Sequence, residues 1–121
     1  MIDKNEWLDR IEEFLEEISD VEFQERVWVR GEGPEVSSYS DLMCGLFDDF
    51  SFDAFLDESW GQFDLSETLH EELLRIRSQL NQFDPGNPMN SEKIVNDPMW
   101  GQIRRDCLII LNHFRAERAS I

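Results

Sequence analysis

The stretch FDDFSFDAFLDESWGQFD, residues 47–64, combines many aromatic side chains with many carboxylates and contains no basic residue. Its aromatics are Phe47, Phe50, Phe52, Phe55, Trp60 and Phe63, and its acids are Asp48, Asp49, Asp53, Asp57, Glu58 and Asp64. The aromatic rings need a core to bury into, whereas the carboxylates repel one another and gain most from a cationic neighbour. Because the chain supplies few bases, we expect that neighbour to be another molecule.

The aromatic side chains of this stretch are expected to divide between core and surface. A short helix capped by Ser51 is predicted, and the residues expected in the core are Phe47, Phe52, Phe55 and Leu56. Phe50 and Trp60 are expected at the rim of the core, where they can serve as apolar anchors for a partner.

The sequence before this stretch predicts helices. From Asp3 onward, apolar residues recur at spacings of three and four, and Asp3 with Glu6 matches a capping arrangement. Residues 21–29 follow Asp20, a capping residue, and favour a helix, with a short strand as the competing interpretation because the segment ends in VWV. The run GEGPEVSS, residues 31–38, breaks the chain before a helix that begins near Tyr39 and that Ser37, Ser38 or Ser40 caps.

The sequence after the stretch also predicts helices. The segment LSETLHEELLRIRSQLNQF, residues 65–83, opens at Ser66 and carries an apolar side, and DPGNPMN ends it. Residues 91–95 can form one turn, after which Asp97 and Pro98 begin a final helix. The sequence therefore predicts one all-α domain over residues 1–121, a compact irregular bundle of about four longer helices plus short helices.

The charge of the chain is strongly negative and unevenly placed. The net charge is −16; residues 1–64 hold nineteen acids and four bases, whereas residues 65–121 hold eight acids and seven bases. Such a field repels nucleic acid and anionic membranes and attracts basic proteins. Direct nucleic-acid or membrane binding is therefore excluded as a predicted function, and the expected partner is a basic protein.

The two cysteines and the hydropathy of the chain bear on its compartment. Cys44 and Cys107 lie within apolar helical patterns and are predicted to be buried thiols of a reducing compartment. The N-terminus lacks a signal-peptide pattern, and no apolar run is long enough to span a membrane. We therefore expect a cytoplasmic location.

The sequence contains no motif typical of catalysis or metal binding. His70 and His113 are the only imidazoles, and neither belongs to a cluster with metal-ligand spacing. Asp48 and Asp49 could in principle bind calcium or act as acid and base, but phenylalanines occupy positions where a calcium loop needs glycine and oxygen ligands. We predict no enzyme activity, no metal and no cofactor.

The acids of residues 47–64 have two interpretations, a solvated face and a face that docks a partner. In the second, carboxylates accept charge-assisted hydrogen bonds from the arginines and lysines of a partner, and Glu32 and Glu35 extend the surface. The predicted partner-binding residues are Asp48, Asp49, Asp53, Asp57, Glu58, Trp60, Glu32 and Glu35. Such a surface suits a protein that plugs the basic substrate cleft of a nuclease.

Two segments carry a family resemblance, FQERVWVRGEGPEV at residues 23–36 and YSDLMCGLFDDF at residues 39–50, together with the acidic aromatic residues that follow. This arrangement resembles bacterial immunity proteins of contact-dependent growth inhibition and related polymorphic toxin systems. The resemblance implies a cytosolic inhibitor that binds the toxic domain of a secreted effector, with a nuclease as the expected toxin.

Two other functions compete with this interpretation. Acids on helices can imitate the phosphate spacing of DNA, so a phage-type DNA mimic that inhibits a DNA-binding enzyme is the alternative. It requires carboxylates spread over an elongated face. A small enzyme requires a cleft that brings His70 or His113 beside paired carboxylates.

Overall fold

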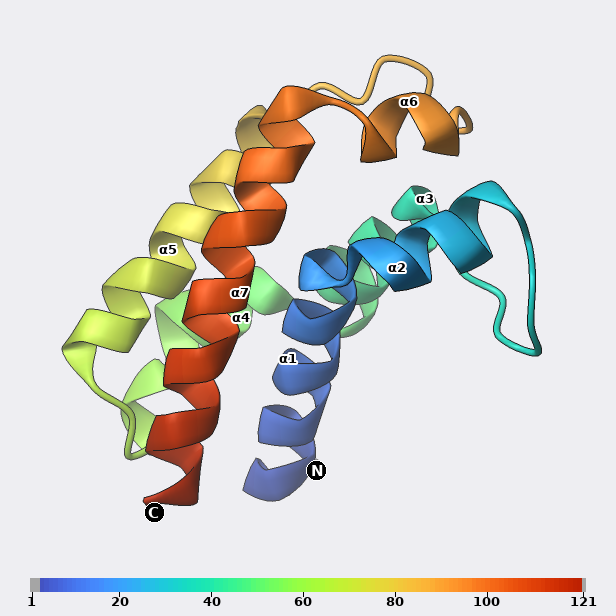
Figure 1. The fold of residues 1–121 in the computed structure, drawn as a ribbon. Helices are drawn as coiled ribbons and strands as arrows, with labels where there is room; N and C mark the ends of the chain where they lie inside the picture. The colour runs from blue at the N-terminus through green and yellow to red at the C-terminus, as the bar shows by residue number, and fades with distance from the viewer. Residues whose placement is uncertain (1–2, 121) are drawn as a thin grey trace.

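The computed structural model describes residues 3–120, and over this range it contains seven α-helices and no strand (Figure 1). The all-α prediction is confirmed. The predicted domain also includes residues 1, 2 and 121, which lie outside the described residues. Three longer α-helices form the body of the molecule: α1 (Lys4–Ser19), α5 (Glu67–Gln82) and α7 (Pro98–Ala119).

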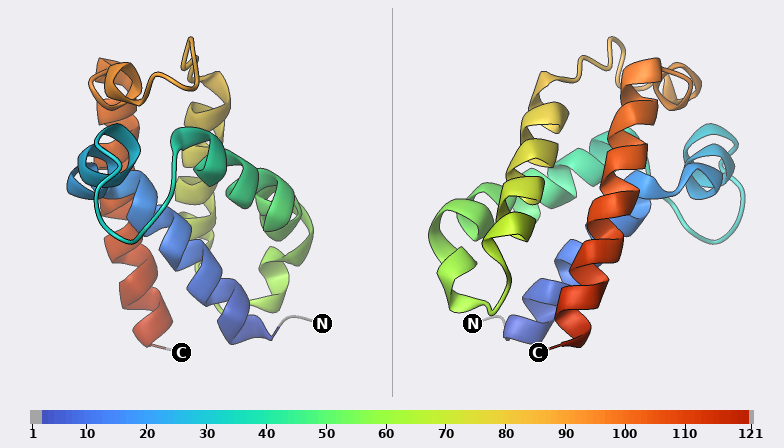
Figure 2. Two further views of the ribbon diagram at one scale, coloured as in Figure 1. Left: turned by 90° about the vertical axis from the view of Figure 1, so that its right-hand side faces the viewer. Right: turned by 60° about the vertical axis from the view of Figure 1, so that its left-hand side comes forward.

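Helix α7 lies between α1 and α5 and packs against both (Figures 1 and 2). The apolar residues of α1 that recur at three and four positions, Leu8, Ile11, Leu15 and Ile18, are buried, as the periodicity predicts. The matching buried residues of α7 are Trp100, Ile103, Cys107, Ile110, Leu111 and Phe114. The first and last helices of the described chain therefore share one core.

Three short α-helical segments each continue into a π-helical segment. These pairs are α2 (Val21–Phe23) with η1 (Gln24–Val29), α3 (Tyr39–Met43) with η2 (Cys44–Asp49), and α4 (Phe52–Ala54) with η3 (Phe55–Ser59). A 3-10 turn, η4 (Trp60–Gln62), follows η3. Residues 21–29 are therefore helical, and the competing strand interpretation is wrong.

Most of the predicted caps are present. The Asp20 and Ser38 side chains accept hydrogen bonds from the backbone N–H groups of Phe23 and Asp41, at 3.0 and 3.1 Å. Ser66 caps α5 and Asp97 caps α7, which begins with Pro98 as predicted. The turn predicted at residues 91–95 is α6 (Ser91–Val95).

Two predicted caps do not form. Asp3 precedes α1 and Ser51 precedes α4, but neither side chain makes a capping hydrogen bond. Ser51 instead has a φ of 60°, in the left-handed region, where a residue other than glycine is uncommon. This backbone conformation turns the chain sharply between η2 and α4. Ser51 therefore shapes the turn through its backbone, and its hydroxyl group does not cap α4.

The residues of the aromatic stretch that were predicted to be in the core do contribute to it. Phe52, Phe55 and Leu56 are buried, and Phe47 is partly buried against the core. The Phe55 ring lies at the centre of an aromatic cluster, with centroid distances of 5.2 Å to Phe63 and 5.7 Å to Trp60. The cluster joins residues 47–64 to α1, because Phe55 also stacks on Trp7 at 6.0 Å.

The two cysteines differ in environment. Cys107 is buried in α7, its thiol donates to the Leu15 carbonyl at 3.4 Å, and burial raises the pKa of this thiol. Cys44 is exposed, so the prediction that both thiols are buried is wrong for Cys44. Cys44 lies two residues from the buried Leu42 and two from the buried Leu46, which places it on the opposite side of the helix from both.

Candidate protein-binding site

The five acids predicted for partner binding within residues 47–64 are all exposed. Asp48 and Asp49 belong to η2, Asp53 belongs to α4, and Asp57 and Glu58 belong to η3. These residues follow one another along a segment whose aromatic side chains point into the core. Burial of the aromatics therefore leaves the carboxylates at the surface.

Arg77 of α5 pairs with two of these acids. Its guanidinium donates to the Asp53 carboxylate at 3.1 Å and to the Asp57 carboxylate at 3.0 Å. The hydrogen bond from Arg77 lowers the pKa of the Asp57 carboxyl group. The expectation that another molecule supplies the cationic neighbour is thus wrong for Asp53 and Asp57.

Glu32 and Glu35 are also paired within the chain. Arg30 donates to Glu32 at 2.7 Å, and both terminal nitrogens of Arg26 donate to Glu35 at 3.0 Å. The Arg26 hydrogen bonds lower the pKa of Glu35 to about 2. These pairs hold the loop after η1, so both carboxylates have a structural role in the free protein.

The prediction that Phe50 and Trp60 lie at the rim of the core as anchors for a partner is wrong, because the two side chains are only 5% and 6% exposed. Phe50 packs edge-on against Trp7, with ring centroids 5.2 Å apart, and Trp60 stacks on His70 at 4.7 Å. Burial of such large rings outweighs any gain from leaving them at the surface. The two buried rings therefore pack on the core side of the segment that carries the exposed acids.

Three predicted acids remain without an internal partner. Among the described residues, the carboxylates of Asp48, Asp49 and Glu58 form no ion pair and accept no hydrogen bond. We call these three residues the acidic surface. Their charge is available to a partner without first breaking an internal pair.

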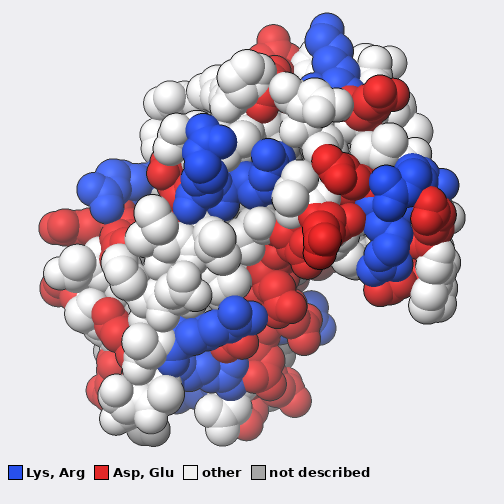
Figure 3. Space-filling model, in the orientation of Figure 1, with Lys and Arg blue, Asp and Glu red and all other residues white. Residues whose placement is uncertain are grey.

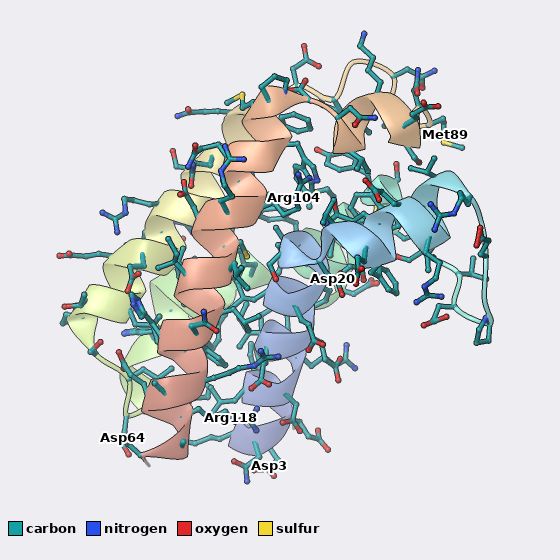
Figure 4. The ribbon with its side chains drawn as sticks, in the orientation of Figure 1. Asp3, Asp20, Asp64, Met89, Arg104 and Arg118 are labelled. Carbon is teal, nitrogen blue, oxygen red and sulfur yellow. The ribbon has the colours of Figure 1, made fainter. Side chains whose placement is uncertain are left out.

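A second acidic region, which the sequence did not single out, lies where α1 turns into α2. A hollow of about 240 Å³ is lined by Glu13, Glu16, Glu17, Asp20 and Phe23, and we call it the acidic hollow. Figure 3 shows it as a concave, largely acidic area, and Figure 4 labels Asp20 at the junction of the two helices. The hollow depends on the direction in which α2 leaves α1, which the sequence pattern does not give.

Glu17 gives the acidic hollow a fixed wall. One of its carboxylate oxygens accepts hydrogen bonds from the Trp28 indole at 3.0 Å and from the Ser37 hydroxyl at 2.7 Å. These bonds tie α1 to η1 and to the end of the 31–38 loop. The hollow is therefore preformed, which reduces the ordering cost of binding a partner.

The adjacent face of α1 is neutralised by α7, and this pairing includes Glu16 of the acidic hollow. Arg115 donates to Glu12 at 3.3 Å and to Glu16 at 3.1 Å, and Arg118 contacts Asp9 and Glu12. Figure 4 labels Arg118 between the two helices. The basic end of α7 therefore pairs with α1, in addition to suiting the end of its own helix.

The two histidines make local contacts. A His70 ring nitrogen lies 2.8 Å from the Leu56 carbonyl, and His113 Nδ1 lies 2.8 Å from Glu72 of α5. Among residues 3–120, no three His, Cys, Asp or Glu side chains group in a way that could hold a metal ion. None of the described helices is long and apolar enough to cross a membrane.

Comparisons of the chain with protein-family models, with curated proteins and with solved structures gave no significant match. The geometry and the charge of the site therefore carry the functional argument.

Proposed function

We propose that this protein is an immunity protein that binds and neutralises a cognate bacterial toxin domain, a basic nuclease, in the cytoplasm. In this proposal the protein acts by binding over the substrate cleft of the toxin and performs no chemistry of its own. The acidic surface and the acidic hollow are the regions that contact the toxin.

One observation carries the proposal: among residues 3–120, the carboxylates of the acidic surface remain exposed and unpaired after the internal pairs are formed. The chain has eleven bases for 27 acids, and Arg26, Arg30, Arg77, Arg115 and Arg118 are already engaged by acids of the same chain. The remaining excess of negative charge is concentrated in residues 1–64, the half of the chain that contains α1 and residues 47–64. Such an excess destabilises the free protein through repulsion and is relieved by a basic partner.

A nuclease is the proposed target because its substrate cleft must carry bases that hold phosphate groups. The Asp48, Asp49 and Glu58 carboxylates can accept charge-assisted hydrogen bonds from the same arginines and lysines. The contact then competes directly with substrate. Association is expected to be fast at low ionic strength and slower as salt screens the attraction.

Co-expression with the toxin domain encoded by the neighbouring gene tests this proposal. We expect the protein to rescue cells from the toxin and to co-purify with it at low salt. A failure of both rescue and co-purification would remove the proposed function. The Asp48→Lys/Asp49→Lys variant is expected to lose rescue, whereas Glu71→Lys/Glu92→Lys, which makes the same charge change at exposed acids of α5 and α6, is expected to retain it.

A further inference from the structure

Val36 is the most exposed large apolar side chain among residues 3–120, at 92%. It lies in the loop of residues 31–38, which follows η1 and runs outside the helices of the body (Figure 1). A single exposed valine is ordinary on a protein surface. Val36 differs from such a residue because its neighbours on both sides in the chain are held in place.

The residue before Val36 is held by Arg26 of η1. Both terminal nitrogens of Arg26 donate to the Glu35 carboxylate at 3.0 Å, and one of them also donates to the Glu32 carbonyl at 3.4 Å. Gly33 allows this close approach, because its φ is 87° and a β-carbon at this position would collide with the Arg26 guanidinium. The loop is therefore closed tightly around one arginine.

The residue after Val36 is held by α1. The Ser37 hydroxyl donates to the Glu17 carboxylate at 2.7 Å, and the same oxygen accepts a hydrogen bond from the Trp28 indole. Because Glu17 also lines the acidic hollow, this end of the loop is fixed to the wall of that hollow. None of these contacts buries Val36, so the loop is ordered while its valine stays in water.

An ordered loop that exposes an apolar side chain is suited to binding another protein. Association costs free energy, because loops and side chains at the surface lose conformational freedom. In this protein the internal hydrogen bonds have ordered the loop before a partner arrives. Interfaces also combine apolar contacts with a polar rim, and Val36 adjoins the carboxylates of the acidic hollow through Ser37 and Glu17.

We propose that Val36 is an apolar anchor for the toxin domain and that the loop of residues 31–38 holds it in position. Apolar side chains of the toxin cover Val36, and arginine or lysine side chains of the toxin enter the acidic hollow. Charge complementarity selects this partner, because the carboxylates beside Val36 favour a basic surface. Glu32 and Glu35 then contribute to binding by ordering the loop. The inference rests on the proposed function, since it concerns a contact with the same toxin domain.

Isothermal titration calorimetry with the toxin domain encoded by the neighbouring gene tests the contact. Val36→Ser should weaken binding by about tenfold, and the loss should persist at high salt because it comes from apolar burial. Ile109→Ser is the matched control: it removes an apolar side chain that is 55% exposed on α7, and it should leave the affinity unchanged. Circular dichroism should show the same helix content in both variants as in the unmodified protein.

A double-mutant cycle tests the role of the loop. Gly33→Ala should displace the Arg26 guanidinium and loosen the loop without removing a side chain that a partner could contact. It should weaken binding by about fivefold while Val36 is present, because the partner must then order the loop. In the Val36→Ser background the same change should have little effect. Equal losses in the two backgrounds would overturn the positioning role of the loop.

The outcomes separate this inference from the proposed function. If the unmodified protein binds the toxin domain and Val36→Ser binds it equally well, the inference is wrong and the proposed function stands. If the unmodified protein does not bind, both are wrong. Self-association that Val36→Ser abolishes would assign the valine to contacts between copies of this chain and would also overturn the inference.

Discussion

The side-chain oxygen of Gln24 accepts a hydrogen bond from the Trp100 indole nitrogen at 2.9 Å, and both side chains are completely buried. The Gln24 amide nitrogen donates to the carbonyls of Glu17 and Ile18, at 2.7 and 2.9 Å. These carbonyls are at the end of α1, where backbone acceptors lack partners within the helix. One amide therefore joins η1, the end of α1 and the start of α7.

Replacing this amide should be costly. Gln24→Leu leaves the Trp100 N–H and two carbonyls of α1 without their partner in the core, and a loss of about 2–4 kcal/mol of unfolding free energy is expected. Urea denaturation followed by tryptophan fluorescence measures it. Gln82→Leu, at an exposed position of α5, is the control and should change stability by less than about 0.5 kcal/mol. Equal stability of the two variants would contradict the role assigned to Gln24.

Removing Arg77 should change the titration of Asp57. Because the Arg77 hydrogen bond is the main cause of the lowered pKa, Arg77→Ala should raise the pKa of Asp57 toward its ordinary value. A carboxyl-carbon NMR titration measures this shift. Arg75→Ala, on the same helix, should leave the Asp57 titration unchanged, and an unchanged titration in Arg77→Ala would show that the pair does not form in solution.

The pairing of α7 with α1 should depend on salt. Arg118→Ala removes contacts with Asp9 and Glu12, and a loss of about 1 kcal/mol is expected at low ionic strength, since solvent screens a partly exposed pair. The difference from the unmodified protein should shrink in high salt. Thermal denaturation at two salt concentrations tests this, with Lys93→Ala as a control that removes a base of α6 that forms no ion pair within residues 3–120. A loss independent of salt would assign the effect to packing.

The two cysteines should react at very different rates. Cys44 is exposed, whereas Cys107 is buried and its thiol has a raised pKa, which lowers its reactivity. Ellman's reagent should therefore modify one thiol in the folded protein and both in denaturant. Cys44→Ser should abolish the reaction of the folded protein, and rapid modification of that variant would contradict the burial of Cys107.

The loop of residues 31–38 should loosen only in strong acid. The folded-state pKa of Glu35 is about 2, below the ordinary value of 4.5, so the Arg26 pair stabilises the loop above pH 4.5. This stabilisation is lost as the pH falls from 4.5 toward 2. An NMR titration should find the Glu35 midpoint near pH 2, and Arg26→Gln should move it upward; a midpoint near 4.5 in the unmodified protein would rule out the pair.

The sequence was sufficient to predict the long helices. In α1 and α5 the apolar residues keep one period over sixteen residues, and Ser66 and Asp97 mark helix starts by their local chemistry. Such signals lie within one or two turns of the residues that they affect. They therefore need no knowledge of the remainder of the fold.

The details of the candidate site could be obtained only in part. Phe50 and Trp60 each lie four residues after a buried leucine, Leu46 and Leu56, so their inward positions agree with a helical spacing that the sequence contains. The contacts between distant parts of the chain could not be obtained from such spacings. Arg77 meets Asp53 from 24 residues away, and only the packing of α5 brings them together. The acidic hollow likewise depends on the turn between α1 and α2.

The packing of α1 against α7 has a consequence for synthesis of the protein. Leu8, Ile11 and Leu15 leave the ribosome long before α7, the helix that packs against α1 and begins at Pro98. During translation the apolar side of α1 must stay exposed or find a temporary cover, and such nascent chains are prone to aggregate. Closing contacts over so long a sequence separation also slows folding. The nascent chain is therefore expected to depend on chaperones until α7 emerges.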